Sequence, residues 1–310
     1  MRVFSKAQII ARFNPELAVS QLEEGFIAYS EGKVQVPPVQ GFAFKGANGD
    51  CCVKSAYIEG SPTFTVKLST GFYDNPSKGL PSNDGLMLVL SAHTGQPLAL
   101  LQDQGWLTAM RTALAGRIAA RLLAPAHVRA TGMQAQMQLE QLRAVTDCRQ
   151  VIVWGRHERG LAAYTAFARE LGFAVHSTQD AAEVAGAANL IVCTTPSRQA
   201  LLHSDWVQPG THITAVGADA PGKQELDPAL VARADRIIVD AIAQCSQYGE
   251  VAHALGSGQI DAHQLIELGT LLAGRAKGRE HDSQITLADL TGVAVQDAQV
   301  ASYALAALCT

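Results

Sequence analysis

Strand and helix patterns alternate along the chain from residue 127 to residue 239, and this alternation limits the possible folds more than any other feature. Short apolar runs such as 149–154 and 211–216 are separated by longer segments with helical spacing, for example 158–171. Parallel strands need crossovers of this kind, because each strand must start from the same end of the sheet. The pattern therefore predicts a parallel sheet covered by helices.

The N-terminal part of the chain follows a different pattern. Residues 14–31 carry apolar side chains at helical spacing after an Asn and a Pro, which favours an amphipathic helix. Short runs rich in Val, Thr, Phe and Tyr follow between residues 34 and 101, separated by Gly, Asn and Pro, and predict an antiparallel β region. Segment 106–123 is predicted to be one long helix, and 285–310 a strand, a glycine turn and a terminal helix.

Length and composition set limits on the class of protein. The 310 residues suit two domains, and 48% hydrophobic residues with a net charge of −4 indicate a globular protein without a basic field for nucleic acid. We find no apolar run of signal-peptide or membrane-span type, so we expect a cytoplasmic protein with no membrane partner. The six cysteines and nine histidines lack metal-ligand spacing, so we predict no metal site.

An apolar run at 213–216 leads into Gly217, Asp219 and a Pro-Gly turn. In open α/β sheets, ligands bind beyond the carboxyl ends of the strands, which would place Asp219 for proton transfer beside a cofactor. An Asp before Pro-Gly is also ordinary turn chemistry, so the sequence leaves a capping role open.

Residues 128–138 contain a variant of the dinucleotide-binding fingerprint, with Ala130 and Ala135 at two of the three glycine positions. The helix start would bind a pyrophosphate through backbone N–H groups, whereas a plain packing turn is the alternative because Ala130 adds a methyl group. At the end of the next strand, Arg156 favours NADP(H) over NAD(H), since Arg can pair with a 2′-phosphate; a solvated Arg156 and a ribose contact from Glu158 are the alternatives.

The small residues that follow the fourth strand would line the nicotinamide side of the crevice, although such residues are also common turn formers. The predicted cofactor-binding residues from these segments are Thr131, Gly132, Met133, Gln134, Arg156, Thr194, Thr195, Val216 and Gly217.

Several segments, in this order, resemble the ornithine cyclodeaminase/µ-crystallin family: 66–69, 79–81, 94–100, Leu-Thr-Ala-Met-Arg-Thr at 107–112, Gly-Met-Gln-Ala at 132–135, 217–226, and Val-Gln-Asp at 295–297. The resemblance covers nearly the whole chain. It implies an α/β protein in which a Rossmann-type NAD(P)-binding domain, residues 119–284, is inserted into an α+β substrate-binding and dimerisation domain, residues 1–118 plus 285–310. It also implies a homodimer.

The resemblance assigns roles to particular residues. Lys67 and Arg111 match positions that bind the α-carboxylate of a substrate, a structural ion pair being the alternative for each. Asp219 matches the acidic residue that carries protons, and Lys67 is also placed in the catalytic set. Thr112 joins the cofactor-binding residues. Ornithine enzymes of the family carry a further Arg that is absent from residues 37–44 here, and Lys54 is the candidate to replace it, a surface-facing Lys being the alternative.

The resemblance favours an NAD(P)-dependent enzyme that deaminates and cyclises a diamino acid such as L-ornithine, giving L-proline and ammonia by transient hydride transfer. Two alternatives stay open. The first is an NADPH-dependent reductase of ketimines or cyclic imines, or an alanine dehydrogenase, which Arg156 and the missing Arg favour. The second is a protein that binds NADP and an amino or imino acid without turnover, which the altered glycine motif favours.

Overall fold

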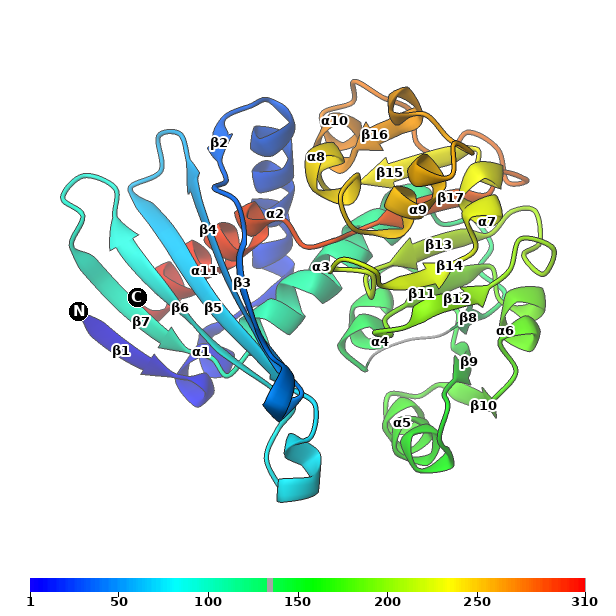
Figure 1. Cartoon of the computed structure of the whole chain (residues 1–310), viewed down its shortest axis with the longest axis horizontal. Coiled ribbons are helices and arrows are strands. Elements are labelled where there is room, and N and C mark those ends of the chain that lie inside the picture. The colour runs from blue at the N-terminus through cyan, green and yellow to red at the C-terminus, as the bar shows by residue number, and fades with distance from the viewer. Residues whose placement is uncertain (133–135, 310) are drawn as a thin grey trace. The chain divides into compact units, whose positions relative to one another are not determined.

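The computed structural model describes residues 1–132 and 136–309 (Figure 1). Contacts between Cα atoms divide the chain into two compact units: unit 1 comprises Met1–Arg111 and Ala294–Thr310, and unit 2 comprises Thr112–Val293. The predicted boundaries fall at 118/119 and 284/285, whereas these divisions fall at 111/112 and 293/294.

Unit 1 is built on one seven-stranded sheet whose order is β1-β7-β6-β5-β4-β2, with β3 also paired to β4. β1 pairs with β7 in parallel, and the other pairs are antiparallel. Long uninterrupted pairing joins the central strands, which fixes which side chains lie opposite one another. The strands are β1 (Arg2–Ser5), β2 (Val34–Gln35), β3 (Gln40–Phe44), β4 (Gly49–Ile58), β5 (Thr63–Phe72), β6 (Asn83–Ser91) and β7 (Pro97–Gln102).

Three helices belong to this unit: α1 (Lys6–Arg12), α2 (Pro15–Ser30) and α11 (Ala294–Cys309). α2 begins after Asn14, whose side chain accepts a hydrogen bond from the Glu16 N–H, and Pro15 occupies its first position. α11 contacts α2, β4 and β5, so the end of the chain packs on the N-terminal sheet as predicted. Ala294 and Ala298 of this helix pack against Ala56 of β4.

Unit 2 contains an eight-stranded sheet in the order β10-β9-β8-β11-β13-β17-β15-β16, and every pair in it is parallel. The chain runs outward from β8 to β10 and then returns to start β11 beside β8, so the strand order reverses between these two strands. This is the Rossmann type of doubly wound sheet. The strands are β8 (Thr131–Gly132), β9 (Gln150–Trp154), β10 (Ala174–Thr178), β11 (Leu190–Cys193), β13 (His212–Ala215), β15 (Arg236–Val239), β16 (Leu265–Glu267) and β17 (Thr286–Asp289).

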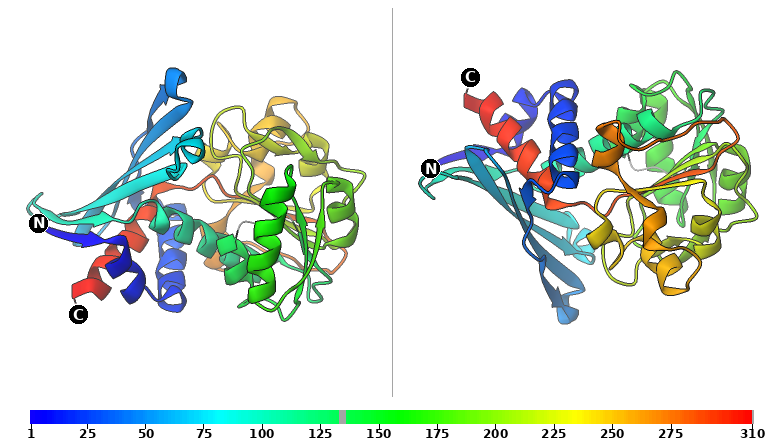
Figure 2. Two further views of the ribbon diagram at one scale, coloured as in Figure 1. Left: turned by 90° about the horizontal axis from the view of Figure 1, so that it is seen from below. Right: turned by 90° about the horizontal axis from the view of Figure 1, so that it is seen from above.

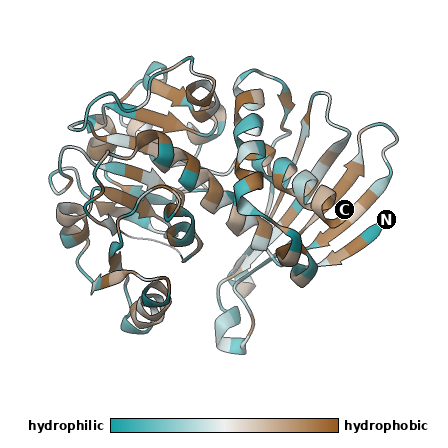
Figure 3. Ribbon diagram, turned by 180° about the vertical axis from the view of Figure 1, so that it is seen from behind, coloured by the Kyte–Doolittle hydropathy of each residue, from teal (hydrophilic) through white to brown (hydrophobic). Residues whose placement is uncertain are grey.

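Most crossovers of unit 2 contain a helix, whereas residues 194–211 between β11 and β13 contain a short strand, and the parallel strands lie between helices (Figure 2). Their apolar side chains form the core, which Figure 3 marks in brown along the strands. The long helix α3 (Trp106–Leu123) has its last twelve residues in this unit. The other helices are α4 (Gln136–Leu142), α5 (Glu158–Glu170), α6 (Ala181–Ala187), α7 (Pro228–Arg233), α8 (Ile242–Cys245), α9 (Glu250–Gly256) and α10 (Leu268–Leu272).

The fold class predicted from the sequence is confirmed, and the differences are local. The first strand of the parallel sheet is Thr131–Gly132, whereas residues 127–131 were expected, and β17 continues the parallel sheet although it lies beyond residue 285. A separate pair of short parallel strands, β12 (Arg198–Leu202) and β14 (Gln224–Leu226), was not predicted. Both are too short and too polar to produce a clear strand pattern.

Candidate active site

A buried cluster of charged side chains lies in unit 1. Lys67 Nζ is 2.9 Å from Asp297 Oδ2, and Arg111 Nε is 3.1 Å from Asp297 Oδ1. The Arg111 guanidinium also donates a hydrogen bond of 2.9 Å to Gln296 Oε1. Lys67 and Asp297 each expose only 2% of their side chains, so this is an interior site and not a surface ion pair.

Local structure explains why these side chains meet. Lys67 lies in the middle of β5 on the face that alternation directs inward, and the sheet register places Lys54 of β4 directly opposite it. Asp297 belongs to the first turn of α11, where the helix dipole favours a negative charge. Arg111 comes from the unit 1 part of α3. Strands β4 and β5 and helix α3 therefore each place one cation near the carboxylate of Asp297.

The cluster carries more positive than negative charge. The pKa of Lys67 is lowered to about 8, chiefly by burial and also by the charges of Arg111 and Lys54, while Asp297 opposes the change. Burial alone would raise the pKa of Asp297, but the neighbouring cations outweigh that effect and hold it below its usual range. Asp103 interacts with Lys67, and burial raises the pKa of this carboxyl. An excess of cations in a dry site suits the carboxylate of a small molecule.

The second group of predicted site residues lies at the carboxyl edge of the parallel sheet in unit 2. β9, β8, β11 and β13 are neighbours in the sheet, so Arg156, Thr194, Thr195, Val216 and Gly217 follow strand ends on the same edge. The reversal of strand order between β8 and β11 lies among them, and nucleotides bind at such a reversal. These residues fit a dinucleotide in their position and in their small or polar side chains.

Asp219 lies on the segment that follows β13, beyond the sheet. Its side chain is 52% exposed, and its Oδ1 atom is 2.6 Å from Lys223 Nζ, which is only 17% exposed. The carboxylate is therefore open to solvent and held by one cation.

Two residues of the predicted fingerprint, Thr131 and Gly132, form the buried strand β8. Thr131 is buried and its hydroxyl donates a 3.5 Å hydrogen bond to the carbonyl of Gln150. Gly132 lies inside the sheet, and a Cβ atom there would overlap Val184 of α6, so glycine is needed for strand–helix packing. Met133 and Gln134 lie outside the described residues.

Arg156 and Thr112, two further predicted cofactor-binding residues, each accept a hydrogen bond from a glutamine side chain. Arg156 is exposed directly after β9, and its carbonyl accepts a 3.2 Å hydrogen bond from Gln179 Nε2. The Thr112 carbonyl accepts a 3.1 Å hydrogen bond from Gln138 Nε2, which joins α3 to α4. Because Arg156 is exposed at the end of β9, its position suits contact with a nucleotide ribose.

The structure adds residues that the sequence interpretation did not assign. Asp297 and Gln296 complete the cation cluster, and the signal for them was two polar residues at the start of an otherwise apolar helix. Glu225 and Glu250 are fully buried near the strand ends of unit 2. Burial raises the pKa of Glu225 to about 7 against hydrogen bonds from Thr195 and Gly217, and burial together with Asp289 raises the pKa of Glu250 well above its usual range.

Comparison with known proteins agrees with this arrangement. The sequence profile of the ornithine cyclodeaminase/mu-crystallin family matches residues 2–306. The chain belongs to this family. Among curated relatives, an uncharacterized cyclodeaminase of Sinorhizobium fredii is 40% identical over 295 residues, which are 93% of this chain and 89% of the relative.

Two solved structures of the family are similar over the whole chain. An archaeal alanine dehydrogenase dimer with bound NAD has a TM-score of 0.91 and 33% identity, and the match covers 100% of this chain and 96% of that one. Thermococcus litoralis Delta(1)-pyrroline-2-carboxylate reductase in complex with NADH and L-proline has a TM-score of 0.93 and 26% identity, covering 100% and 98%.

These relatives identify the kind of protein. The family member described here is an enzyme related to cyclodeaminases and to NAD-dependent dehydrogenases and reductases, and the two solved relatives contain bound NAD or NADH. The strand order and the residues at the carboxyl edge of unit 2 agree with that cofactor.

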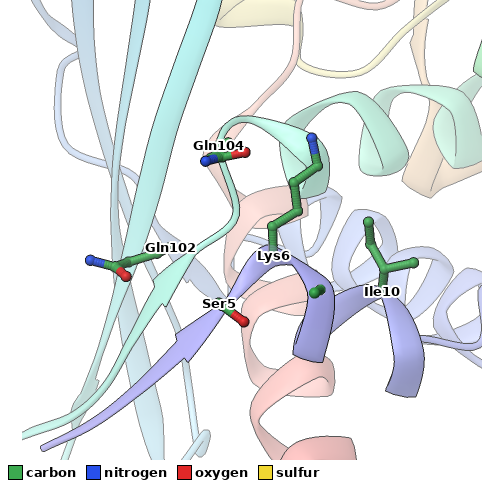
Figure 4. Close-up of a pocket in the computed structure, with 6 residues that line it drawn as sticks. Ser5, Lys6, Ile10, Gln102 and Gln104 are labelled. Carbon is green, nitrogen blue, oxygen red and sulfur yellow. The ribbon is translucent and has the colours of Figure 1, made fainter.

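Other hollows and groups do not include the predicted site residues. A shallow depression of about 460 Å³ in unit 1 lies between the start of α1 and the segment after β7, with Ser5, Lys6, Ile10, Gln102 and Gln104 around it (Figure 4).

Within residues 1–132 and 136–309, no helix has the length and apolar character of a membrane span. The same part of the chain holds no group of three His, Cys, Asp or Glu residues that could bind a metal.

Proposed function

We propose that this protein is an ornithine cyclodeaminase-like enzyme that uses NAD(P) to deaminate and cyclise a diamino acid such as L-ornithine, forming L-proline and ammonia. The observation that carries the proposal is the exposed carboxylate of Asp219, which Lys223 holds at 2.6 Å on the segment after β13. Deamination needs a group that passes protons to a departing amine, and an accessible carboxylate serves that purpose.

The cation cluster supports the substrate class. Lys67, Arg111 and Lys54 supply positive charge in excess of Asp297, which is what an α-carboxylate requires. The planar guanidinium of Arg111 is suited to a two-point contact with that group. Lys67 loses and gains its proton near neutral pH, because burial lowers its pKa to about 8, so it is also a candidate for proton transfer.

When bound, the nicotinamide cofactor supplies the oxidation of the α-carbon and the later reduction of the ring. Asp219 delivers a proton to the leaving amine and takes one from the side-chain amine that closes the ring. Lys223 keeps the Asp219 carboxylate in position during both transfers. Arg156 favours NADP(H) over NAD(H), and a homodimer is the assembly we propose.

An assay of cofactor balance tests the reaction. Purified protein is incubated with L-ornithine and catalytic NAD⁺ or NADP⁺, and ammonia and NAD(P)H absorbance are followed together. A cyclodeaminase releases ammonia with no net change in NAD(P)H. Stoichiometric formation or consumption of NAD(P)H, or no ammonia from any diamino acid, would contradict the proposal.

Asp219→Asn tests the residue assignment in the same assay. Ammonia release should fall by about 10²- to 10⁴-fold, the usual contribution of a general acid–base group, while nucleotide affinity stays close to wild type. Asp205→Asn is the matched control, because Asp205 is an exposed aspartate elsewhere in unit 2. Turnover retained in Asp219→Asn would show that another group carries the proton.

The second candidate is a reductase of cyclic imines or ketimines, or an alanine dehydrogenase. Arg156, exposed at the end of β9, favours it because an Arg at this place can accommodate the 2′-phosphate of NADPH. A panel of cyclic imines and 2-oxo acids with ammonia, assayed with NADPH and NADH, distinguishes this activity by stoichiometric loss of the reduced cofactor.

A further inference from the structure

Glu225 occupies an unusual position for a carboxylate. It is the middle residue of the short strand β14, and its side chain is fully buried. Its Oε1 atom accepts a hydrogen bond of 2.7 Å from the backbone N–H of Thr195, on the segment that follows β11. A buried carboxylate normally costs stability unless it is well bonded, so its retention here calls for a specific structural reason.

The same carboxylate also contacts the segment that follows β13. A Cβ atom on Gly217 would overlap both Glu225 Oε2 and the carbonyl oxygen of Thr195, and would lie 2.7 Å from the Thr195 nitrogen. Only a residue without a side chain fits between them. Glu225 therefore connects the strand-end segments of β11 and β13, which are neighbours in the parallel sheet.

The strand that carries Glu225 is held in place by hydrogen bonds to α9. Glu250, the first residue of that helix, accepts hydrogen bonds of 2.8 Å and 2.9 Å from the backbone N–H groups of Glu225 and Leu226. The His253 ring bonds to the carbonyl of Lys223 at 2.8 Å. Asp289 in turn accepts a 2.9 Å bond from the Val251 N–H, which anchors the start of α9 to the end of β17. The carboxylate has little freedom to move.

We propose that Glu225 is a positioning residue that holds the Thr195 and Gly217 backbones in the arrangement that receives the nicotinamide end of the cofactor. The inference rests on the proposed function only through the shared cofactor site. Glu225 acts on the ligand through two backbone segments, and it needs no contact with the substrate.

The side chain that best replaces Glu225 follows from this geometry. The carbonyl oxygen of a glutamine can accept the Thr195 N–H in the same place, whereas an aspartate is one methylene too short and an alanine leaves the N–H without its acceptor. We therefore expect NADH dissociation constants near wild type for Glu225→Gln. They should be about tenfold higher for Glu225→Asp and Glu225→Ala.

The experiment measures NADH binding by fluorescence titration for the wild type, the three variants and Gln224→Ala, a control in the same strand whose side chain bonds to the Leu226 carbonyl. Circular dichroism and thermal unfolding identify folded variants, and Glu225→Asp serves if Glu225→Ala does not fold. Rescue by Gln with weakened binding in Asp supports the inference, because a purely structural loss would lower stability without changing the affinity of the folded fraction.

Two results would overturn the inference. One is a wild-type affinity for NADH in folded Glu225→Asp or Glu225→Ala, and the other is an absence of binding of both NADH and NADPH in the wild type. Failure of the proposed function is a separate outcome, since a protein that binds NADH normally but releases no ammonia leaves the effect of Glu225 on binding fully measurable.

Discussion

The two units stabilise buried charge in different ways. In unit 1, Lys67 and Arg111 pair with the carboxylate of Asp297, so opposite charges meet directly in the interior. In unit 2, Glu225 and Glu250 accept hydrogen bonds from backbone N–H groups. Direct pairing holds the pKa of Asp297 below its usual range, while burial lowers that of Lys67 to about 8. Backbone bonding fixes main-chain segments and leaves the carboxyls with raised pKa values.

This difference matches what each unit must provide. A site for a substrate carboxylate needs permanent positive charge, which the unit 1 cluster retains because Asp297 balances only part of it. A dinucleotide site needs backbone groups in fixed positions and no strong negative charge near the phosphates. Glu225 and Glu250 fix backbone segments of unit 2, and their raised pKa values reduce the negative charge that they carry.

The largest expected effect comes from removing the central carboxylate of unit 1. Asp297→Asn leaves Lys67 and Arg111 buried without a balancing charge, and breaking a buried pair in this way costs about 3–5 kcal/mol of unfolding free energy. Urea unfolding measures the loss. Glu183→Gln is the control, since Glu183 pairs with His176 on an exposed surface and its loss should leave the midpoint unchanged. Equal midpoints for both variants would show that direct pairing does not stabilise unit 1.

A smaller loss is expected from filling the space between the strand-end segments of unit 2. Gly217→Ala forces a methyl group against Glu225 and the Thr195 peptide and should cost about 1–3 kcal/mol, with weaker NADH binding. Gly186→Ala provides the comparison, because Gly186 lies in α6 with open space around it and its replacement should be neutral or slightly stabilising. Wild-type stability and affinity in Gly217→Ala would contradict the tight contact.

The pH dependence of stability should have opposite signs in the two units. The pKa of Glu225 is raised to about 7 by burial, so its contribution to stability is fully present below its ordinary value of 4.5 and is lost as pH rises through 7. Burial lowers the pKa of Lys67 to about 8, so its contribution is present above its ordinary value of 10.5 and lost as pH falls through 8.

Glu225→Gln isolates the unit 2 effect. The unfolding free energy of wild type minus that of the variant should fall by roughly 1–2 kcal/mol between pH 5 and pH 8, because only the wild type must release a proton inside the fold. Urea unfolding at several pH values gives this difference. A difference that stays constant or rises over the range would show that Glu225 is ionised throughout.

Much of the fold was predictable from local patterns. The helix Trp106–Leu123 and the long antiparallel strands have strong periodicity, so their existence followed from the sequence. Lys54 stands opposite Lys67 because of the pairing register of β4 and β5, which no local pattern contains. Asp297 joins these residues from the far end of the chain, a contact that depends on how α11 packs on the sheet.

For two glycines of unit 2, the sequence indicated the position but not the neighbouring residues. Gly132 and Gly217 were predicted from a motif and from a strand end, but their close neighbours, Val184 and Glu225, come from elements distant in sequence or too short to predict. Gly217 follows the end of β13, whereas Gly132 lies inside β8, and the reason that each position needs a glycine came only from packing.

The smallest expected effect concerns cofactor choice, which depends on an exposed cation at the edge of unit 2. Arg156→Ser removes the charge expected to bind a 2′-phosphate, so affinity for NADPH should fall about tenfold while affinity for NADH changes little. Arg159→Ser is the control, because Arg159 is exposed on the neighbouring turn of α5. Fluorescence titrations with both cofactors measure the ratio. If the ratio is the same in wild type and Arg156→Ser, the exposed charge does not select the cofactor, and Glu158 becomes the residue to test because a carboxylate at this edge would favour the 2′-hydroxyl of NADH.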